Sequence, residues 1–424
     1  MTRIALPAFA FLFALLAAPL SPLAQEAATT TTTATEGAGP TIAREAFVID
    51  FDTGTILMNK NGDNRMPTSS MSKTMTIYMA FDAIKSGKLT LDTKLPVSEK
   101  AWRMQGSKMF VELGSAIAVE DLIRGIVIQS GNDATVVMAE GIAGTEADFA
   151  DLTNAKAKEL GMLNTHFVNA SGWPDPEHYS TAHDLAILAM STIRNFPEFY
   201  KYYAEKEFTW HNIHQMNRNP LIFRDIGADG LKTGHAEEAG AGYGLIGSAV
   251  KDGRRVVVVL NGLPDEKARA QESSRIIEWA LRSFENVKLF TAGDIVDHAE
   301  VTMGQAGQVA LTIDKDVVVT VPKAVKNDMK VTVSYNGPLM APVKKGDQVG
   351  TLKIDVPRVG VVEYPLYAAA DVAKLGLFAG TLQKAKIMLG GHASRTLDSA
   401  MNAATNATTA ASTAITTVPA GAEQ

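Results

Sequence analysis

The chain has 424 residues, a formal net charge of −6 at pH 7 and no cysteine. Its length is too great for one small domain and fits two or more. Lysine and arginine form no stripe or cluster along the sequence, which disfavours nucleic-acid binding. Without cysteine, the chain is indifferent to the redox state of its compartment.

The N-terminal residues 1–24 have the composition of a secretory signal peptide. Arg3 provides a positive charge, Ile4 to Leu20 is almost continuously apolar, and small residues follow, with a cleavage site predicted after Ala24. An uncleaved transmembrane anchor is the alternative, but the apolar run falls short of the roughly 20 residues that a membrane span requires. We therefore expect an exported protein, located in the periplasm.

The next residues predict a linker and then an α+β domain over residues 41–290. Residues 25–40 are a low-complexity segment rich in Thr, Ala and Gly, without the apolar residues of a core. Apolar periodicity and turn residues predict strands at 46–51, 55–58, 232–235, 243–250 and 256–260, and helices at 70–85 and 274–284. Two more helices are expected after capping sequences at Thr145 and Thr181. This order indicates an antiparallel sheet covered by helices.

The composition changes after Asp294. Residues 297–368 alternate apolar and polar positions between turn sequences, which predicts a small all-β C-terminal domain. Residues 371–389 allow an amphipathic helix. The Ala/Thr-rich residues 390–424 are expected to form a disordered tail.

Three short polar motifs carry the functional information: Ser70-Met71-Ser72-Lys73, Ser130-Gly131-Asn132 and Lys232-Thr233-Gly234. Each alone has a simpler explanation, such as a solvated first helical turn or a helix cap. Together, in this order and on a predicted helix, loop and strand, they match the S-x-x-K, S-D-N and K-T-G set of serine β-lactamases and penicillin-binding proteins. The second motif differs from that set by Gly131.

The first motif has the spacing of an activated nucleophile. A serine hydroxyl is a weak nucleophile at neutral pH and needs a base beside it. Ser70 and Lys73 would lie one helical turn apart on the same face, so the lysine can reach the hydroxyl. A lysine acts as a base only if burial or a nearby cation lowers its pKa. We expect Lys232 to be that second cation.

The other two motifs supply groups for proton transfer and substrate binding. Ser130 has a hydroxyl suited to proton transfer to a leaving group, and the amide of Asn132 suits a peptide. Lys232 and Thr233 offer a cation and a hydroxyl to a substrate carboxylate. The backbone N–H of His235 could join that of Ser70 as an oxyanion hole. We expect neither a cofactor nor a metal, because His211-x-x-His214 has no further ligand pair.

The sequence resembles the low-molecular-mass penicillin-binding proteins, which are serine-type D-alanyl-D-alanine carboxypeptidases. Beyond the three motifs, the resemblance rests on Phe208-Thr-Trp, Asn217-Arg-Asn, Gly230 to Gly240 and Arg269 to Glu285. It extends over residues 40–290 and more loosely over the β-domain.

The resemblance implies a role for each motif residue. Ser70 would form the acyl-enzyme, Lys73 would be the general base, and Ser130 would carry the proton to the leaving D-alanine. The substrate would be bound by Asn132, Lys232, Thr233 and the N–H of His235. That substrate would be the stem peptide of peptidoglycan, and β-lactam antibiotics would acylate the same serine.

Membrane attachment is where this chain departs from the family pattern. The family uses a C-terminal amphipathic helix to stay on the outer face of the inner membrane. Residues 371–389 have little aromatic content, whereas an interfacial helix needs strong apolar anchors. We therefore expect only weak peripheral membrane contact through this segment.

Three alternative functions are compatible with some of the same motif residues. A serine β-lactamase of the kind that deacylates rapidly would carry an E-x-x-L-N pattern between the second and third motifs, and none occurs between Asn132 and Lys232. A D,D-endopeptidase that cuts cross-links stays open. An inactive binding module is disfavoured, because Ser70, Lys73, Ser130 and Lys232 are all present.

Overall fold

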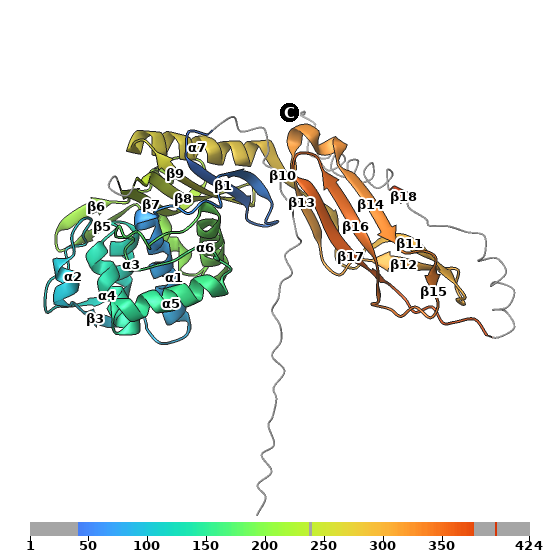
Figure 1. Cartoon of the computed structure of the whole chain (residues 1–424), viewed down its shortest axis with the longest axis horizontal. Coiled ribbons are helices and arrows are strands. Elements are labelled where there is room, and N and C mark those ends of the chain that lie inside the picture. Colours follow the sequence, from blue (N-terminus) through green and yellow to red (C-terminus); the bar gives the residue numbers. More distant parts are fainter. Residues whose placement is uncertain (1–40, 237–239, 377–394, 397–424) are drawn as a thin grey trace, which may run out of the picture.

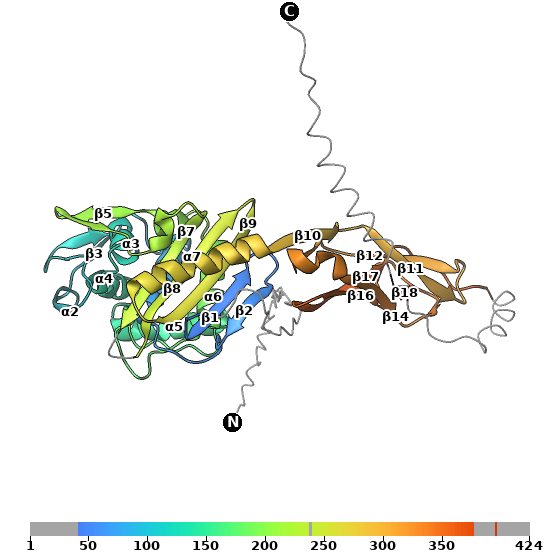
Figure 2. The same ribbon diagram turned by 90° about the horizontal axis from the view of Figure 1, so that it is seen from above.

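The computed structural model describes residues 41–236, 240–376 and 395–396. It contains two domains joined end to end along the long axis of the molecule (Figures 1 and 2). The predicted signal peptide, the linker, residues 377–389 of the predicted helix and nearly all of the predicted tail lie outside the described residues. Within those described residues, no helix combines the length and apolar character that crossing a membrane requires.

The N-terminal domain is built on an antiparallel five-stranded sheet, as predicted. Its strands, in the spatial order β2-β1-β9-β8-β7, are β2 (Ile56–Lys60), β1 (Glu45–Asp50), β9 (Arg254–Leu263), β8 (Gly242–Lys251) and β7 (Ala228–Ala236). Successive side chains of a strand point to opposite faces. Accordingly, Phe47 and Ile49 join the core on one face of the sheet, and Ala46 and Val48 join the core on the other. Both faces are therefore buried.

Helices cover the two faces unequally. The long α7 (Glu266–Ser283) lies across one face, over β8 and β9, as Figure 2 shows. The other face carries a helical layer and two small two-stranded sheets, β3-β4 and β5-β6. These elements are η1 (Ser69–Ser72), α1 (Lys73–Lys85), β3 (Lys94–Pro96), α2 (Glu99–Arg103), β4 (Ala116–Ala118), α3 (Val119–Val127), α4 (Asn132–Ala143), α5 (Glu146–Glu159), α6 (Ala182–Asn195), η2 (Tyr200–Ala204), β5 (Glu207–Trp210) and β6 (Ile213–Met216). The short η3 (Pro220–Phe223) lies on the side of α7, because it contacts α7 and its Leu221 joins the core there.

The helix boundaries follow local capping chemistry. The hydroxyls of Thr145 and Thr181 accept the backbone N–H three residues later, which confirms both predicted helix starts. The predicted helix at 274–284 begins earlier, at Glu266, because Asp265 caps it in the same way. Its first two turns are polar, so apolar periodicity did not reveal them.

The C-terminal domain is all β, as predicted. A seven-stranded sheet has the order β15-β11-β12-β17-β16-β14-β18, and β10 pairs separately with β13. The elements are β10 (Phe284–Phe290), β11 (Ile295–Thr302), β12 (Gln308–Thr312), β13 (Val317–Pro322), η4 (Lys323–Asp328), β14 (Lys330–Tyr335), β15 (Leu339–Met340), β16 (Gln348–Val356), β17 (Gly360–Ala368) and β18 (Arg395–Thr396).

Two sequence-based boundaries of this domain are wrong. β10 pairs with β13 of the C-terminal domain, so the domain begins at Phe284 and the division at residue 290 is too late. The predicted helix does not begin at Asp371, because Val372 and Lys374 form bridges with Val343 and Gly304. Apolar spacing alone did not distinguish this extended edge segment from a helix.

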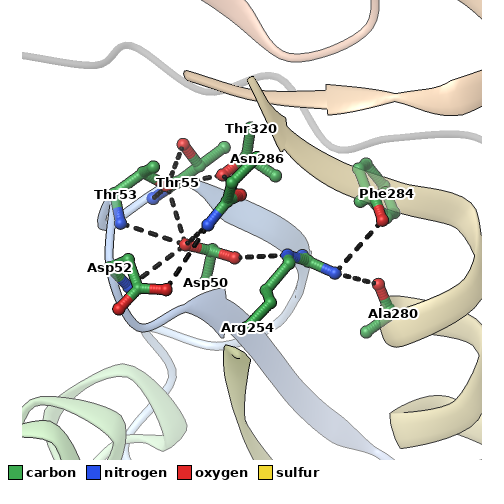
Figure 3. Close-up of polar contacts among 9 residues, drawn as sticks. All are labelled: Asp50, Asp52, Thr53, Thr55, Arg254, Ala280, Phe284, Asn286 and Thr320. Atoms are coloured by element: carbon green, nitrogen blue, oxygen red, sulfur yellow. Dashed lines mark hydrogen bonds and ion pairs between the residues drawn. The ribbon is translucent and has the colours of Figure 1, made fainter. Parts of the chain in front are cut away.

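Asp50 organises the junction between the domains (Figure 3). Its fully buried carboxylate accepts hydrogen bonds from the N–H of Asp52, the N–H of Thr53 and the side-chain amide of Asn286, which lies on β10. Its second oxygen lies 2.7 Å from Arg254 Nε. The β1–β2 turn is thereby joined to β9 of the five-stranded sheet and to β10, the first strand of the second domain.

Arg254 completes this junction. Its guanidinium donates to the carbonyls of Ala280 and Phe284, where α7 ends and β10 begins. Both charges of the Asp50–Arg254 pair are almost completely buried. Removing one partner of such a pair leaves an uncompensated buried charge.

We predict that Arg254→Leu lowers the free energy of unfolding by about 3 kcal/mol, because it strands the Asp50 carboxylate. Denaturant unfolding measures the change. Lys288→Leu is the control, because the Lys288–Asp316 pair is about half exposed and contributes at most about 1 kcal/mol. Equal losses for the two variants would contradict this account of the junction.

Candidate active site

The three predicted motifs converge on one side of the sheet. Ser70 lies in η1, Ser130 lies two residues before the start of α4, and Lys232 lies on β7. Gly234 permits the close contact of β7 with η1, because a Cβ there would lie 2.9 Å from the carbonyl oxygen of Thr68. Ser130 adopts a positive φ of 59°, an unusual conformation that turns the chain into α4.

Ser70 and Lys73 form the hydrogen-bonded pair that the spacing predicts. Lys73 Nζ lies 2.7 Å from Ser70 Oγ and 2.7 Å from the carbonyl oxygen of Ser171. Ser171 belongs to the loop between α5 and α6, which packs tightly on η1. A Cβ at Gly172 would overlap the carbonyl oxygen of Ser69, so only glycine fits there.

The environment of Lys73 makes it a candidate base. Its side chain is fully buried, and this burial lowers the pKa of Lys73 from 10.5 to about 7. The positive charge of Arg218 lowers this pKa further, while Asp133 opposes the shift. A neutral lysine would therefore be available beside Ser70 near pH 7.

Lys232 interacts with Ser130 and is coupled to Lys73. Its Nζ donates to Ser130 Oγ at 3.0 Å and to the carbonyl oxygen of Thr233 at 3.2 Å. Burial, followed by the charges of Lys73 and Arg218, holds the pKa of Lys232 well below its ordinary value. The cation that lowers the pKa of Lys73, in addition to burial, is Arg218. The prediction that Lys232 has this effect on Lys73 is therefore wrong.

Asn132 begins α4 and faces the loop between α2 and β4. Its side-chain amide donates to the carbonyl oxygen of Gln105 at 2.8 Å. The next residue, Asp133, is fully buried and accepts the N–H groups of Met109, Phe110 and Val111. Asp133 therefore fixes the 105–111 loop against the second motif.

A polar pocket of about 350 Å³ opens beside Ser70. Its lining consists of Ser70, Ser107, Ser130, Arg218, Thr233, Gly234, His235, Tyr243, Glu266 and Arg269. Arg218 donates to Ser107 Oγ at 2.5 Å, and Arg269 is paired with Glu266 at 2.8 Å. The pocket places a hydroxyl and guanidinium groups where a small anion could bind next to the nucleophile.

The predicted substrate-binding residues do not all line the same pocket. Thr233 and His235 line this pocket, and the ring of His235 stacks on Tyr243 with centroids 3.9 Å apart. Lys232 is not among the lining residues, and its buried ammonium is hydrogen-bonded to Ser130 Oγ and to the carbonyl oxygen of Thr233. Asn132 lines a neighbouring pocket of about 370 Å³ that also contains Ser70.

Sequence reasoning missed Arg218, Asp133 and the carbonyl of Ser171 as parts of the site. Arg218 was noted only within Asn217-Arg-Asn, because one arginine between two asparagines has no chemical signature of its own. The signal available for Asp133 was an acidic residue directly after the second motif, at the start of a helix. A backbone carbonyl leaves no signal in a sequence.

Comparison with known families agrees with both domains. Residues 30–263 match the family described as D-alanyl-D-alanine carboxypeptidase, and residues 284–374 match the C-terminal domain of penicillin-binding protein 5. The chain is 35% identical to D-alanyl-D-alanine carboxypeptidase DacA of Haemophilus influenzae, over 80% of this chain and 88% of that protein. It is 30% identical to a D-alanyl-D-alanine endopeptidase of Escherichia coli, over 61% of this chain and 84% of that protein.

Solved structures show the same similarity. Penicillin-binding protein 5 of Haemophilus influenzae has a TM-score of 0.71 and 34% identity, covering 81% of this chain and 100% of that chain. Penicillin-binding protein D2 of Listeria monocytogenes, in its ampicillin-bound form, has a TM-score of 0.53 and 29% identity, covering 57% of this chain and 98% of that chain.

We predict that the ammonium of Lys73 titrates near pH 7, and that Arg218→Gln moves its pKa upward because removing a nearby positive charge favours the protonated form. Heteronuclear NMR of lysine-labelled protein, assigned with Lys73→Arg, measures both values. The exposed Arg224 on the same connection to β7 gives the control Arg224→Gln, which leaves the titration in place. A Lys73 titration near pH 10 would contradict the account of its burial.

Proposed function

The chain belongs to the D-alanyl-D-alanine carboxypeptidase family, and we propose that it removes the terminal D-alanine from peptidoglycan stem peptides through an acyl-enzyme on Ser70. The observation that carries this proposal is the contact of 2.7 Å between Ser70 Oγ and a buried lysine whose pKa is about 7. A base of this pKa suits proton transfer at neutral pH.

The polar pocket supports one direction for the substrate. Arg218 and Thr233 line it and would bind the terminal carboxylate, which places the last peptide bond beside Ser70. Arg218 takes over the cationic role that the sequence analysis gave to Lys232. Asn132 would hold the peptide on the other side of Ser70.

Acylation would then proceed in one addition and one elimination. Neutral Lys73 takes the hydroxyl proton as Ser70 Oγ bonds to the scissile carbonyl carbon, and the N–H groups of Ser70 and His235 stabilise the resulting oxyanion. The C–N bond breaks as Ser130, polarised by Lys232, gives its proton to the leaving D-alanine. Lys73 then passes its proton to Ser130, which restores the Ser130 hydroxyl. Water then hydrolyses the ester and restores Ser70.

β-Lactam antibiotics would acylate Ser70 as well, and the adduct would persist. The similarity to an ampicillin-bound penicillin-binding protein supports this binding. The sequence between Asn132 and Lys232 contains no E-x-x-L-N pattern to activate water, which disfavours the β-lactamase alternative. The similarity to an endopeptidase keeps cleavage of cross-linked D-alanyl bonds as the second candidate activity.

We further propose that the protein is exported to the periplasm and touches the outer face of the inner membrane through residues 377–389. The signal-like composition of residues 1–24 supports the export. Val372 and Lys374 form bridges within the C-terminal domain, so we assign the contact to residues 377–389.

Ser70→Ala is predicted to abolish D-alanine release from a peptide ending in D-Ala-D-Ala, because the nucleophile is lost. Enzymatic assay of free D-alanine measures this. Ser86→Ala, at the exposed end of α1, is the matched control and retains the activity of the unaltered protein. Equal release by Ser70→Ala and the unaltered chain would refute the proposal, and release from cross-linked dimers alone would favour the endopeptidase.

Membrane contact is tested by a chain that ends at Gly376, which keeps the bridges of Val372 and Lys374. We predict that it sediments less with anionic vesicles than the full chain does, because the apolar positions of 377–389 are gone. Equal sedimentation of the two proteins would exclude this segment as the contact.

A further inference from the structure

His178 is a buried histidine that takes no part in the reaction described above. It lies in the loop between α5 and α6 and is only 4% exposed. Both of its ring nitrogens have partners. Nδ1 lies 3.1 Å from the backbone nitrogen of Val168, and Nε2 lies 2.7 Å from Ser72 Oγ. Because Ser72 belongs to η1, the ring connects this loop to the turn that carries the nucleophile.

These hydrogen bonds determine which ring nitrogen carries the proton. A backbone N–H can only donate, so Nδ1 accepts from Val168 and carries no proton. The proton of the neutral ring is then on Nε2, which donates to Ser72 Oγ. Ser72 Oγ also shares a hydrogen bond with Thr68 Oγ1, immediately before η1. The Nε2 proton is thereby linked to both ends of η1.

The ring of His178 stays neutral over a wide range of pH. Burial lowers the pKa of His178 from 6.5 to about 4. The negative charge of Asp175 opposes this shift, and the charges of His166 and Lys73 add to it. A histidine is neutral at every pH well above its pKa, so the Nε2 proton is available to Ser72 from about pH 5 upward.

Two other contacts attach the loop on either side of η1. Before η1, Met66 and Ser180 exchange two backbone hydrogen bonds. Beyond η1, Thr76 Oγ1 on α1 donates to the carbonyl oxygen of Ala170. Between these two contacts, His178 supplies a side-chain hydrogen bond from the loop to η1 itself.

The same loop encloses Lys73. The carbonyl oxygen of Ser171 accepts a hydrogen bond from Lys73 Nζ, and Gly172 packs against the carbonyl of Ser69. Burial is the largest cause of the lowered pKa of Lys73. If the loop moved away from η1, water would reach the amine, and the pKa of Lys73 would rise toward its ordinary value.

We propose that His178 is a positioning residue for acylation, whose hydrogen bond to Ser72 keeps the α5–α6 loop against η1 and so keeps Lys73 dehydrated beside Ser70. His178 contacts none of the reacting atoms. The inference rests on the proposed acyl-enzyme mechanism, because that mechanism needs a neutral Lys73 as the base.

Two substitutions of His178 separate the two hydrogen bonds of its ring. In His178→Gln, the longer side chain brings an amide N–H to the position of Nε2 and retains the donation to Ser72. In His178→Asn, the shorter amide replaces Nδ1 beside Val168 and does not reach Ser72. The charged groups around Lys73, which are Arg218, Asp133 and Lys232, are the same in both variants.

The measurement is the pH dependence of Ser70 acylation by a β-lactam, followed by intact-protein mass. We expect His178→Asn to move the inflection upward by about one pH unit, which lowers the rate constant at pH 7 about fivefold. Near pH 9 its rate constant is expected to approach that of the unaltered chain, because Lys73 is then largely neutral in both. His178→Gln is expected to keep the original inflection.

Ser72→Ala removes the same hydrogen bond from the other side. It is expected to raise the inflection as His178→Asn does, and it provides the test if His178→Asn does not fold. His214→Gln is the control, because His214 lies half exposed on β6, where it pairs with Glu207. This control is expected to leave the inflection in place.

The outcomes separate this inference from the proposed function. An unchanged inflection in His178→Asn and Ser72→Ala would overturn the positioning role, even if both variants unfold more easily. Absence of acylation in the unaltered chain would instead overturn the proposed function. In that case NMR titration of Lys73 still tests the positioning role, which predicts a higher Lys73 pKa in His178→Asn and is overturned by an equal one.

Discussion

The burial of one ammonium group, that of Lys73, is the constraint on which the active site depends. Its two hydrogen-bond partners are a hydroxyl and a carbonyl oxygen, neither of which carries a negative charge. A carboxylate in either place would hold the lysine protonated. With neutral partners, a buried environment and Arg218 nearby, the neutral amine becomes available near pH 7. The surroundings of Lys73 thus turn its amine into a proton acceptor.

Close contacts between three parts of the chain produce this burial. Gly234 brings β7 against η1, and Gly172 brings the α5–α6 loop against Ser69, in both cases where a Cβ has no room. Asp133 holds the third segment by accepting three backbone N–H groups. The Asp50–Arg254 pair lies apart from these contacts and links the sheet to the second domain. Separate sets of contacts therefore stabilise the surroundings of the nucleophile and the attachment of the second domain.

The sequence predicted the parts of the molecule that depend on local chemistry. The motif spacing placed Ser70 beside Lys73, the threonine caps marked two helix starts, and alternation marked the strands of both domains. Long-range packing decided the rest. Arg218 approaches Lys73 from 145 positions further along the chain, and nothing in its neighbours indicates this. Extended residues 371–376 resemble a helix in spacing, because their strand character comes from partners at Val343 and Gly304.

Pre-steady-state acylation of Ser70 by a β-lactam, followed by intact-protein mass across a range of pH, tests the central claim most directly. The account predicts that the acylation rate constant rises tenfold per pH unit below pH 7 and levels off above it, with an inflection at the pKa of about 7 for Lys73. A rate constant that is flat across this range, or one that still rises steadily at pH 9, would contradict the neutral-lysine mechanism.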